Sequence, residues 1–483
     1  MESSLGYEKE LQNYIDNEKS AVKLANYVGE LLYDKGVELV LFRNHLLDTT
    51  NSEIINLHDY AEKVVGKKIF ISTTTALAEE LLELDLAPAK IDIGKLAYEW
   101  VQEGSNFENK RSFLENKLGD LIETDGHKFA PRDVVLYGFG RIGRLAAREL
   151  IKQAGKGQQL RLRAIVTRNN SDEQITKRAA LLRNDSVHND FKGTVSCDYE
   201  NKALIVNGQI ITMIEASNPE DIDYTAYGIN NALIIDNTGV YTDKEALSRH
   251  LKAKGADKVL LTAPGKEIPN IVYGINHFDL DLDGTKIYSA ASCTTNAISP
   301  ILKVINDKFG VEKGHIETVH AYTNDQNLLD NFHKKPRRGR SAAINMVITS
   351  TGAGKAVTKV IPDLADKLTA NAVRVPTPNG SLAILNLTIG RETSLEEVNS
   401  VIKDAALNGN LVNQIFYSID EELVSNDIIG NTCCSVYDAP ATIVSPDKKN
   451  IVLYTWYDNE FGYTKQVIRL AKYIAKVRRL IYY

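Results

Sequence analysis

The spacing of apolar residues divides the chain into three regions that predict different structures. From the start to residue 130, apolar side chains recur every three or four positions, which is the period of an α-helix with one buried face. This spacing is clear over residues 22–32 and 57–65, and a further helix is expected over 76–82 with Thr75 as its N-cap. The pattern therefore predicts an additional, mostly helical N-terminal domain over residues 1–130.

The second region, residues 131–292, alternates short apolar runs with helically spaced segments. Strands are expected at 134–137, 160–166, 232–235 and 259–262. Helices are expected at 141–150 and 244–253. Strands that alternate with helices in this way pair in parallel, and helices cover both faces of the sheet. The region is therefore predicted to be an α/β domain.

The third region begins at residue 293 and contains longer apolar runs. Helical spacing predicts a helix that starts there, includes Pro300 and stops at Gly310. Runs over 383–389 and 451–456 read as strands, which predicts an α+β domain with a largely antiparallel sheet. The last segment, residues 461–483, is basic and amphipathic over most of its length, and we expect it to form a C-terminal helix.

The composition excludes several classes of protein. A chain of 483 residues with 43% apolar and 25% charged residues is ordinary for a globular protein and long enough for about three domains. Its net charge of −6 gives no general attraction to nucleic acid or acidic membranes. Four cysteines, two of them adjacent, form neither a disulfide framework nor a metal-ligand spacing, which favours a reducing, cytoplasmic setting. Neither a membrane-spanning run nor a signal peptide is recognisable.

A glycine-rich turn joins the first expected strand of the α/β domain to its first helix. It consists of Gly138, Phe139, Gly140, Arg141, Ile142 and Gly143. A G-x-G-x-x-G spacing is weak evidence alone, but between a strand and a helix it is typical of a dinucleotide site. The first glycine permits the tight turn, the second lets the backbone approach a pyrophosphate, and the third allows close helix packing. Binding of NAD or NADP is therefore predicted.

The end of the second expected strand bears on which dinucleotide is bound. An Asp or Glu at this place binds the ribose hydroxyls of NAD. The chain has Arg168 near this point and no acid. Arg168 could meet the 2′-phosphate of NADP, or it could be a solvated surface residue. NADP therefore stays an open alternative to NAD.

A cysteine with polar neighbours stands where the helix of the third region starts. Cys293 follows Ser292 and precedes Thr294, and residues of this kind are poorly suited to a core. The positive end of a helix lowers the pKa of a thiol, so we expect Cys293 to be reactive rather than a buried structural residue. His320 follows and supplies a base for covalent catalysis. This pair alone fits a protease or an acyltransferase as well as a dehydrogenase.

Together these motifs resemble phosphorylating glyceraldehyde-3-phosphate dehydrogenase from about residue 134 to the C-terminus. The segments that carry the resemblance follow the family's order: Gly138 to Arg144, Asn237 to Val240, Leu261 to Pro264, Ala291 to Asn296, Thr318 to His320, Ser350 to Ala353, Arg374 to Asn379 and Trp456 to Glu460. The resemblance implies a Rossmann-type dinucleotide-binding domain over 131–292, a catalytic domain over 293–460, and a C-terminal helix over 461–483 that returns to the dinucleotide-binding domain.

The resemblance also implies a role for each matching residue. Cys293 is similar to the nucleophile, and His320 to its base. Cofactor contacts are implied for the glycine-rich turn and for Thr238, Thr262 and Asn459, the last of which matches the asparagine that holds the nicotinamide carboxamide. Thr323 and Arg374 resemble the site for the phosphate of the substrate. The site for the attacking inorganic phosphate is implied at Ser292, Thr294, Thr351 and Gly352.

The implied reaction is the phosphorylating oxidation of glyceraldehyde 3-phosphate, a triose phosphate, to 1,3-bisphosphoglycerate with NAD or NADP. It would pass through a hemithioacetal and a thioester on Cys293. Erythrose-4-phosphate dehydrogenase is an alternative with the same cysteine and histidine, and a non-catalytic scaffold or regulator on this fold is an alternative of another class. The resemblance further implies a cytoplasmic homotetramer without membrane or nucleic-acid partners, acting in glycolysis or gluconeogenesis.

Three features depart from the resemblance or lie outside it. Asp325 occupies a position where many relatives carry threonine, and an acid is unfavourable near a phosphate. The basic stretch 334–340 could contact nucleic acid, but the family's loop here packs at a subunit interface. Residues 1–130 could serve as an oligomerisation arm, a regulatory domain or a partner-binding module, and we favour a helical domain that packs on the catalytic body.

Overall fold

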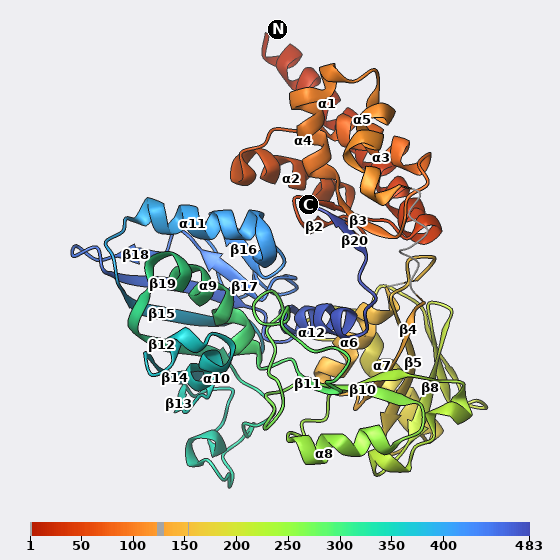
Figure 1. Ribbon diagram of the computed structural model, residues 1–483, viewed down its shortest axis with the longest axis vertical. Helices are drawn as coiled ribbons and strands as arrows, with labels where there is room; N and C mark the ends of the chain where they lie inside the picture. Colours follow the sequence, from red (N-terminus) through yellow and green to blue (C-terminus); the bar gives the residue numbers. More distant parts are fainter. Residues whose placement is uncertain (1, 123–129, 153) are drawn as a thin grey trace. The chain divides into compact units, whose positions relative to one another are not determined.

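The computed structural model describes residues 2–122, 130–152 and 154–483, and the chain folds as two units (Figure 1). The N-terminal unit contains Met1–Pro131, Gln153–Gln159 and the C-terminal tail, Val477–Tyr483. The second unit contains Arg132–Lys152 and Leu160–Lys476. Residues 123–129, which precede the expected boundary at 130, lie outside the described residues. The two ends of the chain thus belong to one folded unit.

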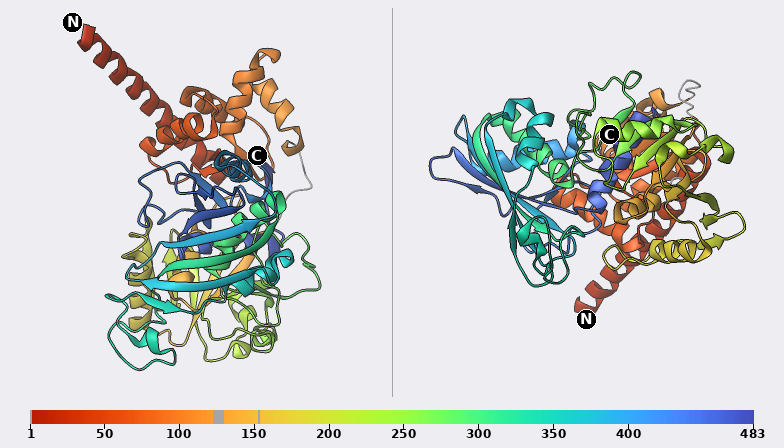
Figure 2. Two further views of the ribbon diagram at one scale, coloured as in Figure 1. Left: turned by 90° about the vertical axis from the view of Figure 1, so that its left-hand side faces the viewer. Right: turned by 90° about the horizontal axis from the view of Figure 1, so that it is seen from below.

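Helices build most of the N-terminal unit, as the apolar spacing predicts. They are α1 (Glu2–Glu30), α2 (Asn51–Tyr60), α3 (Ile71–Leu82), α4 (Ile93–Glu103) and α5 (Lys110–Lys117). The first half of α1 extends away from the other helices of this unit, and its residues 6–14 are exposed (Figure 2). The prediction of Thr75 as an N-cap is wrong. Buried Ile71 begins α3, and the Thr75 hydroxyl inside the helix donates to the Ile71 carbonyl at 2.7 Å.

A small sheet, which the spacing did not predict, completes the N-terminal unit. Its strands are β1 (Glu38–Leu41), β2 (Asn44–His45), β3 (Ala89–Asp92) and β20 (Leu480–Tyr482), in the order β2-β1-β3-β20. The expected helix over 461–483 is therefore wrong in its last part. Helix α12 spans Phe461–Ile474, the left-handed φ of 58° at Lys476 ends the helical path, and β20 pairs in parallel with β3.

Polar contacts hold the C-terminal tail in the N-terminal unit. Arg479 donates to Glu38 at 2.7 Å and to the Gly157 carbonyl at 2.9 Å. Burial raises the pKa of Glu38, but the charges of Lys90, His45 and Arg479 bring it well below its ordinary value. Lys95 donates to the backbone oxygen of Tyr483 at 2.7 Å. The tail is thus an integral strand of this unit.

Removal of residues 477–483 is expected to lower the free energy of unfolding of the N-terminal unit by about 3 kcal/mol or more. The deletion exposes the edge of β3, removes the apolar side chains of Leu480 and Tyr482 from the core of this unit, and takes one cationic partner from half-buried Glu38. Urea unfolding followed by the fluorescence of Trp100 measures this in a W456F background, because the chain has two tryptophans. The matched control is Lys476→Ala, which removes an exposed ion pair with Asp283 and should change stability by less than about 1 kcal/mol. Equal unfolding curves for the truncated and control proteins would contradict a structural role for the tail.

The first sheet of the second unit is the predicted α/β arrangement. Its strands are β4 (Arg132–Tyr137), β5 (Leu160–Thr167), β6 (Val195–Asp198), β7 (Ala203–Val206), β8 (Gln209–Glu215), β9 (Ala232–Asp236), β10 (Ala256–Leu261) and β11 (Ile287–Ser289). They follow the order β11-β10-β9-β4-β5-β8-β7-β6, with the pairs from β11 to β8 parallel and those beyond antiparallel. The helices of this part are α6 (Arg141–Ile151), α7 (Asp172–Arg183) and α8 (Lys244–Ser248). Helix α12 packs on α6, where Lys465 pairs with Glu149 at 2.6 Å.

The second sheet of this unit is mixed and mainly antiparallel, also as predicted. Its strands are β12 (Val311–Ala321), β13 (Val347–Thr349), β14 (Leu368–Val375), β15 (Ser381–Ile389), β16 (Ile415–Ser418), β17 (Ser435–Asp438), β18 (Ile443–Val444) and β19 (Asn450–Tyr457). Alternate residues of β15 are buried, as expected for a sheet with one covered face. Helices α9 (Cys293–Phe309), α10 (Ala353–Val360) and α11 (Leu395–Leu407) pack against it (Figure 2).

Helix α9 continues through Pro300, and a side chain replaces the hydrogen bond that the proline removes. Pro300 has no N–H for the carbonyl of Asn296, four residues earlier. The buried thiol of Cys434 donates to that carbonyl at 3.1 Å. The Ser435 hydroxyl also donates to the neighbouring carbonyl of Ala297. The helix that begins at Cys293 is therefore held by β17 and the segment before it.

Candidate active site

Cys293 is the first residue of α9, where the backbone turns sharply from β11 into the helix. Ala291 has a left-handed φ of 55°, and its carbonyl accepts a hydrogen bond from the Tyr463 hydroxyl at 2.9 Å. The Ser292 hydroxyl caps the helix by accepting from the Thr295 amide at 3.0 Å. These contacts fix the turn, so the thiol is presented at the N-terminus of a rigid helix.

His320 faces this thiol from the end of β12. Its Nε2 lies 3.7 Å from Sγ of Cys293. Its Nδ1 lies 2.7 Å from the Ala321 carbonyl oxygen and 3.1 Å from Nη1 of Arg374. Because the carbonyl contact is the shorter one and a carbonyl oxygen can only accept, we assign the ring proton to Nδ1. In this tautomer Nε2 has a free electron pair directed at the thiol. The pair expected from the sequence is therefore brought together in the arrangement of nucleophile and base.

Arg374 lies beside His320 because β14 and β12 pair in parallel with these two residues in register. Its Nη1 donates to the Ala321 carbonyl at 2.9 Å, the same oxygen that His320 approaches. Burial and the charge of Arg374 lower the pKa of His320 to about 4. The imidazole is therefore neutral near pH 7 and able to accept a proton.

The expected lowering of the cysteine pKa is wrong for this site. Burial raises the pKa of the Cys293 thiol above its ordinary value, although the charge of Arg374 acts in the opposite direction. The position at a helix start is as predicted, but loss of water around the sulfur outweighs it. A protonated thiol beside a neutral imidazole can pass its proton to His320 when the sulfur attacks a carbonyl carbon.

Thr294 places a hydroxyl next to the nucleophile, and the other predicted phosphate-binding residues lie on separate segments. The Thr294 hydroxyl shares a hydrogen bond of 3.0 Å with the hydroxyl of Tyr457. Thr323 follows β12 and is half-buried, and Thr351 and Gly352 lie just before α10. The Thr351 hydroxyl accepts from the amide of Ala353 at 3.2 Å. No direct contact between these last three residues and Cys293 is seen among the described residues, so a bound anion would have to connect them.

Asp325, whose charge is unfavourable near a phosphate, is paired in the structure. Its carboxylate accepts a hydrogen bond from Arg338, which belongs to the basic stretch 334–340. Burial raises the pKa of Asp325, but Arg338 lowers it below its ordinary value. The positive charge of Arg338 thus neutralises the negative charge of Asp325.

The glycine-rich turn between β4 and α6 has the shape that a dinucleotide requires. Gly138 has a φ of 92°, which favours glycine, and a Cβ at Gly143 would lie 2.7 Å from the Gly138 carbonyl oxygen. At Gly140 no heavy atom outside the turn, among the described residues, lies within 4 Å of the place a Cβ would take. No side chain of the described chain caps α6. The first amides of α6 are therefore free of a side-chain cap, which suits a pyrophosphate bound at this helix start.

The other predicted cofactor residues occupy the ends of strands around this turn. Thr238 follows β9 and donates to Asp236 at 2.7 Å, and Thr262 follows β10 and donates to the Asp236 carbonyl at 3.1 Å. Arg168 follows β5 and is exposed. Asn459 follows β19 and is buried, and its Oδ1 accepts from the Ser381 hydroxyl at 2.9 Å. That bond fixes the asparagine and leaves its amide NH₂ to hold a ligand.

The sequence did not reveal several residues that shape the site. Tyr463 supports Ala291, and Ser381 links Asn459 to the Ala321 amide, which donates to the serine hydroxyl at 3.1 Å. Tyr457 bonds Thr294 and packs edge-on against the His320 ring at 5.9 Å. Tyr457 belongs to a segment that carried the resemblance, so its motif was visible although its role was not. Ser381 and Tyr463 gave no signal beyond ordinary strand and helix positions.

Comparison with known proteins matches two parts of the chain to the domains of one family. Residues 132–244 match the family model described as glyceraldehyde 3-phosphate dehydrogenase, NAD binding domain, and residues 292–459 match its C-terminal domain. A glyceraldehyde-3-phosphate dehydrogenase-like protein of Pseudomonas aeruginosa (strain UCBPP-PA14) is 47% identical over 93% of this chain and 98% of its own length. Glyceraldehyde-3-phosphate dehydrogenase of Clostridium pasteurianum is 40% identical over 72% of this chain and 99% of its own. Similarity to the Pseudomonas protein therefore extends into the N-terminal region.

Proposed function

Since the chain belongs to the glyceraldehyde-3-phosphate dehydrogenase family and is an NAD-binding oxidoreductase, we propose that it oxidises glyceraldehyde 3-phosphate and phosphorylates the product. The observation that carries this proposal is the 3.7 Å contact between Cys293 Sγ and Nε2 of a neutral His320. A scaffold without activity has no need of a half-buried thiol facing an unprotonated imidazole.

The first step is attack on the aldehyde. The sulfur of Cys293 forms a bond to the carbonyl carbon, and the thiol proton moves to Nε2 of His320. The former carbonyl oxygen takes up a proton, which gives a hemithioacetal. His320 gives this oxygen the proton that it took from the thiol. The imidazole is then neutral again and can remove the hydroxyl proton of the hemithioacetal as general base. The carbon–hydrogen bond of the hemithioacetal is then weakened by the electron pair on oxygen.

NAD, when bound, supplies the acceptor for the hydride. The residues of this chain that would hold it are the amides of the turn from Gly138 to Gly143, together with Thr238, Thr262 and the amide of Asn459. Loss of hydride from the hemithioacetal carbon leaves a thioester on Cys293. Before the hydride leaves, the amide of Cys293 and the protonated His320 would stabilise the negative charge on the oxygen of the hemithioacetal.

The thioester is then resolved by inorganic phosphate. A phosphate oxygen bonds to the carbonyl carbon, the carbon–sulfur bond breaks, and the thiolate leaves. Ser292, Thr294, Thr351 and Gly352 are proposed to bind the attacking phosphate, and Thr323 and Arg374 the phosphate of the substrate. Arg374 supports this assignment because its half-buried guanidinium lies beside His320 and its positive charge acts on the Cys293 thiol.

Cofactor choice and assembly complete the proposal. Exposed Arg168 could contact the 2′-phosphate of NADP, so NADP use is proposed beside NAD.

Exposed apolar side chains occur in the segment after β12, at Leu328, Leu329, Phe332, Ile344 and Met346, and they support association of copies as a homotetramer. Within the described residues, no helix has the length and apolar character needed to cross a membrane. We propose a cytoplasmic enzyme with small-molecule substrates and no nucleic-acid partner.

The decisive experiment is a reduction assay with each cofactor, with phosphate present and with phosphate omitted. Continuous formation of NADH or NADPH from glyceraldehyde 3-phosphate is expected only when phosphate is present. Erythrose 4-phosphate as the better substrate would reassign the specificity. Turnover without phosphate would indicate hydrolysis of the thioester, and failure of both aldehydes with both cofactors would favour the scaffold.

A further inference from the structure

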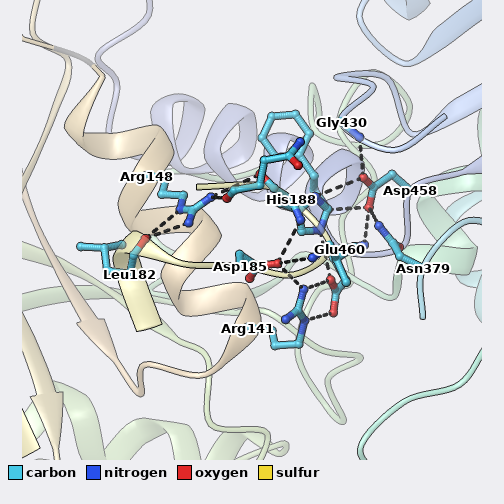
Figure 3. Close-up of polar contacts among 12 residues, drawn as sticks. Arg141, Arg148, Leu182, Asp185, His188, Asn379, Gly430, Asp458 and Glu460 are labelled. Atoms are coloured by element: carbon cyan, nitrogen blue, oxygen red, sulfur yellow. Dashed lines mark hydrogen bonds and ion pairs between the residues drawn. The ribbon is translucent and has the colours of Figure 1, made fainter. Parts of the chain in front are cut away.

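A cluster of charged side chains connects the glycine-rich turn to the segment that carries Asn459 (Figure 3). Arg141, within the turn, donates to both carboxylate oxygens of Glu460, with Nη2 at 2.6 Å from Oε2. The same Nη2 lies 3.2 Å from Asp185. Glu460 directly follows Asn459 and is 13% exposed, so its paired carboxylate is shielded from water. A bidentate arginine–carboxylate pair of this kind fixes the orientation of the Glu460 carboxylate as well as its distance from Arg141.

His188 holds the other side of the same carboxylate. Its Nε2 lies 3.0 Å from Oε2 of Glu460, and its Nδ1 lies 3.8 Å from Asp458. The His188 side chain is 4% exposed. Glu460 is thus held between an arginine and a histidine from two different segments of the dinucleotide-binding part.

Arg141 and His188, the two partners of Glu460, are themselves held in place by Asp185, which accepts from the Arg141 side chain and from the His188 amide. Burial raises the pKa of Asp185, but the backbone amides of His188 and Val187 and the charge of Arg141 lower it to about 2. Arg148 of α6 donates to the carbonyls of Leu182 and Asn189, both at 2.8 Å, which ties the His188 segment to the helix that follows the glycine-rich turn. The cluster therefore rests on α6 and not on a free loop.

Asp458 fixes the opposite side of Asn459. Its Oδ1 accepts from the amides of Glu460 and Phe461, at 2.9 and 2.8 Å, and from the side chain of Asn379 at 2.9 Å. Its Oδ2 accepts from the Gly430 amide at 2.8 Å. Asn459 thus lies between two anchored carboxylates, one facing the catalytic sheet and one facing the glycine-rich turn.

We propose that Glu460 and His188 are positioning residues, which set the place of the Asn459 amide relative to the pyrophosphate site so that the two ends of the cofactor are held in register. This inference rests on the proposed function, because Asn459 is taken to hold the nicotinamide. Neither residue needs to touch the substrate. Their effect reaches the reaction through the orientation of Asn459 alone.

The test measures the rate of NADH formation in a single turnover with glyceraldehyde 3-phosphate, saturating NAD and no phosphate. Glu460→Gln and His188→Gln are each expected to slow this step about tenfold, the equivalent of one hydrogen bond to a charged group. The Kd for ADP-ribose, which lacks nicotinamide, should change less than about twofold because the pyrophosphate site is intact. In an Asn459→Ala background the same substitutions should cause no further loss, since residues that act through one another are not additive.

The matched control is Glu149→Gln, which breaks the ion pair of Glu149 and Lys465 between the same two helices, α6 and α12, away from Asn459. It should lower the melting temperature without slowing the single turnover. Full additivity with Asn459→Ala, an unchanged rate in both variants, or an equal slowing by Glu149→Gln would overturn the positioning role. Absence of both NADH and NADPH, when the unaltered protein is assayed with each cofactor in turn, would instead refute the proposed function itself.

Discussion

Replacement of Cys293 by serine is expected to reduce kcat/KM for glyceraldehyde 3-phosphate by about 10⁴-fold or more. A hydroxyl is a far weaker acid than a thiol, and burial has already raised the pKa of the thiol at this place. His320, whose pKa is about 4, is too weak a base to generate an alkoxide. NADH formation measured by absorbance, with phosphate present, tests this directly.

The control for this substitution is Cys197→Ser. Cys197 lies in β6, is half-buried and has no place in the proposed chemistry. Its replacement should leave kcat/KM within about twofold. Appreciable turnover by Cys293→Ser, with normal folding by circular dichroism, would refute the assigned nucleophile.

The elements that sequence reasoning found are those whose signal is local. The strand before Gly138, the turn and helix α6 are adjacent in the chain, and each has its own pattern of apolar or glycine residues. The same holds for α9, where a small hydroxyl residue precedes Cys293 and Gly310 follows the last turn. Register also mattered for His320 and Arg374, which become neighbours only because β12 and β14 align them, and the family resemblance supplied that information.

The features that were missed depend on partners far away in the chain. Strand β20 has three residues, and its strand character comes from pairing with β3 near residue 90. Apolar spacing continued past α12, so the local pattern favoured a helix there. The pKa of Cys293 likewise depends on burial by the folded chain and on the charge of Arg374 from β14, which no local motif near the cysteine records.

Substitution of His320 by asparagine is expected to lower kcat/KM by about 10³-fold at pH 7, with a deficit that shrinks as pH rises. In the unaltered enzyme the imidazole is neutral above about pH 4 and accepts the thiol proton, so activity should vary little from about pH 6 to about pH 9. Without a base, only the thiolate fraction reacts. Because the thiol pKa is raised, that fraction grows about tenfold for each pH unit throughout this range.

The pH profile separates a base from a structural residue, and His315 provides the matched control. His315 lies on the same strand, β12, with an exposed ring that bonds Thr369 at 2.8 Å and Asn371 at 3.1 Å. His315→Asn should keep both the rate and the flat profile. A deficit for His320→Asn that stays constant with pH would mean that His320 orients the thiol without taking its proton. A rate deficit of His320→Asn that shrinks as pH rises requires proton transfer, because alkaline conditions can replace a base but cannot restore a lost contact.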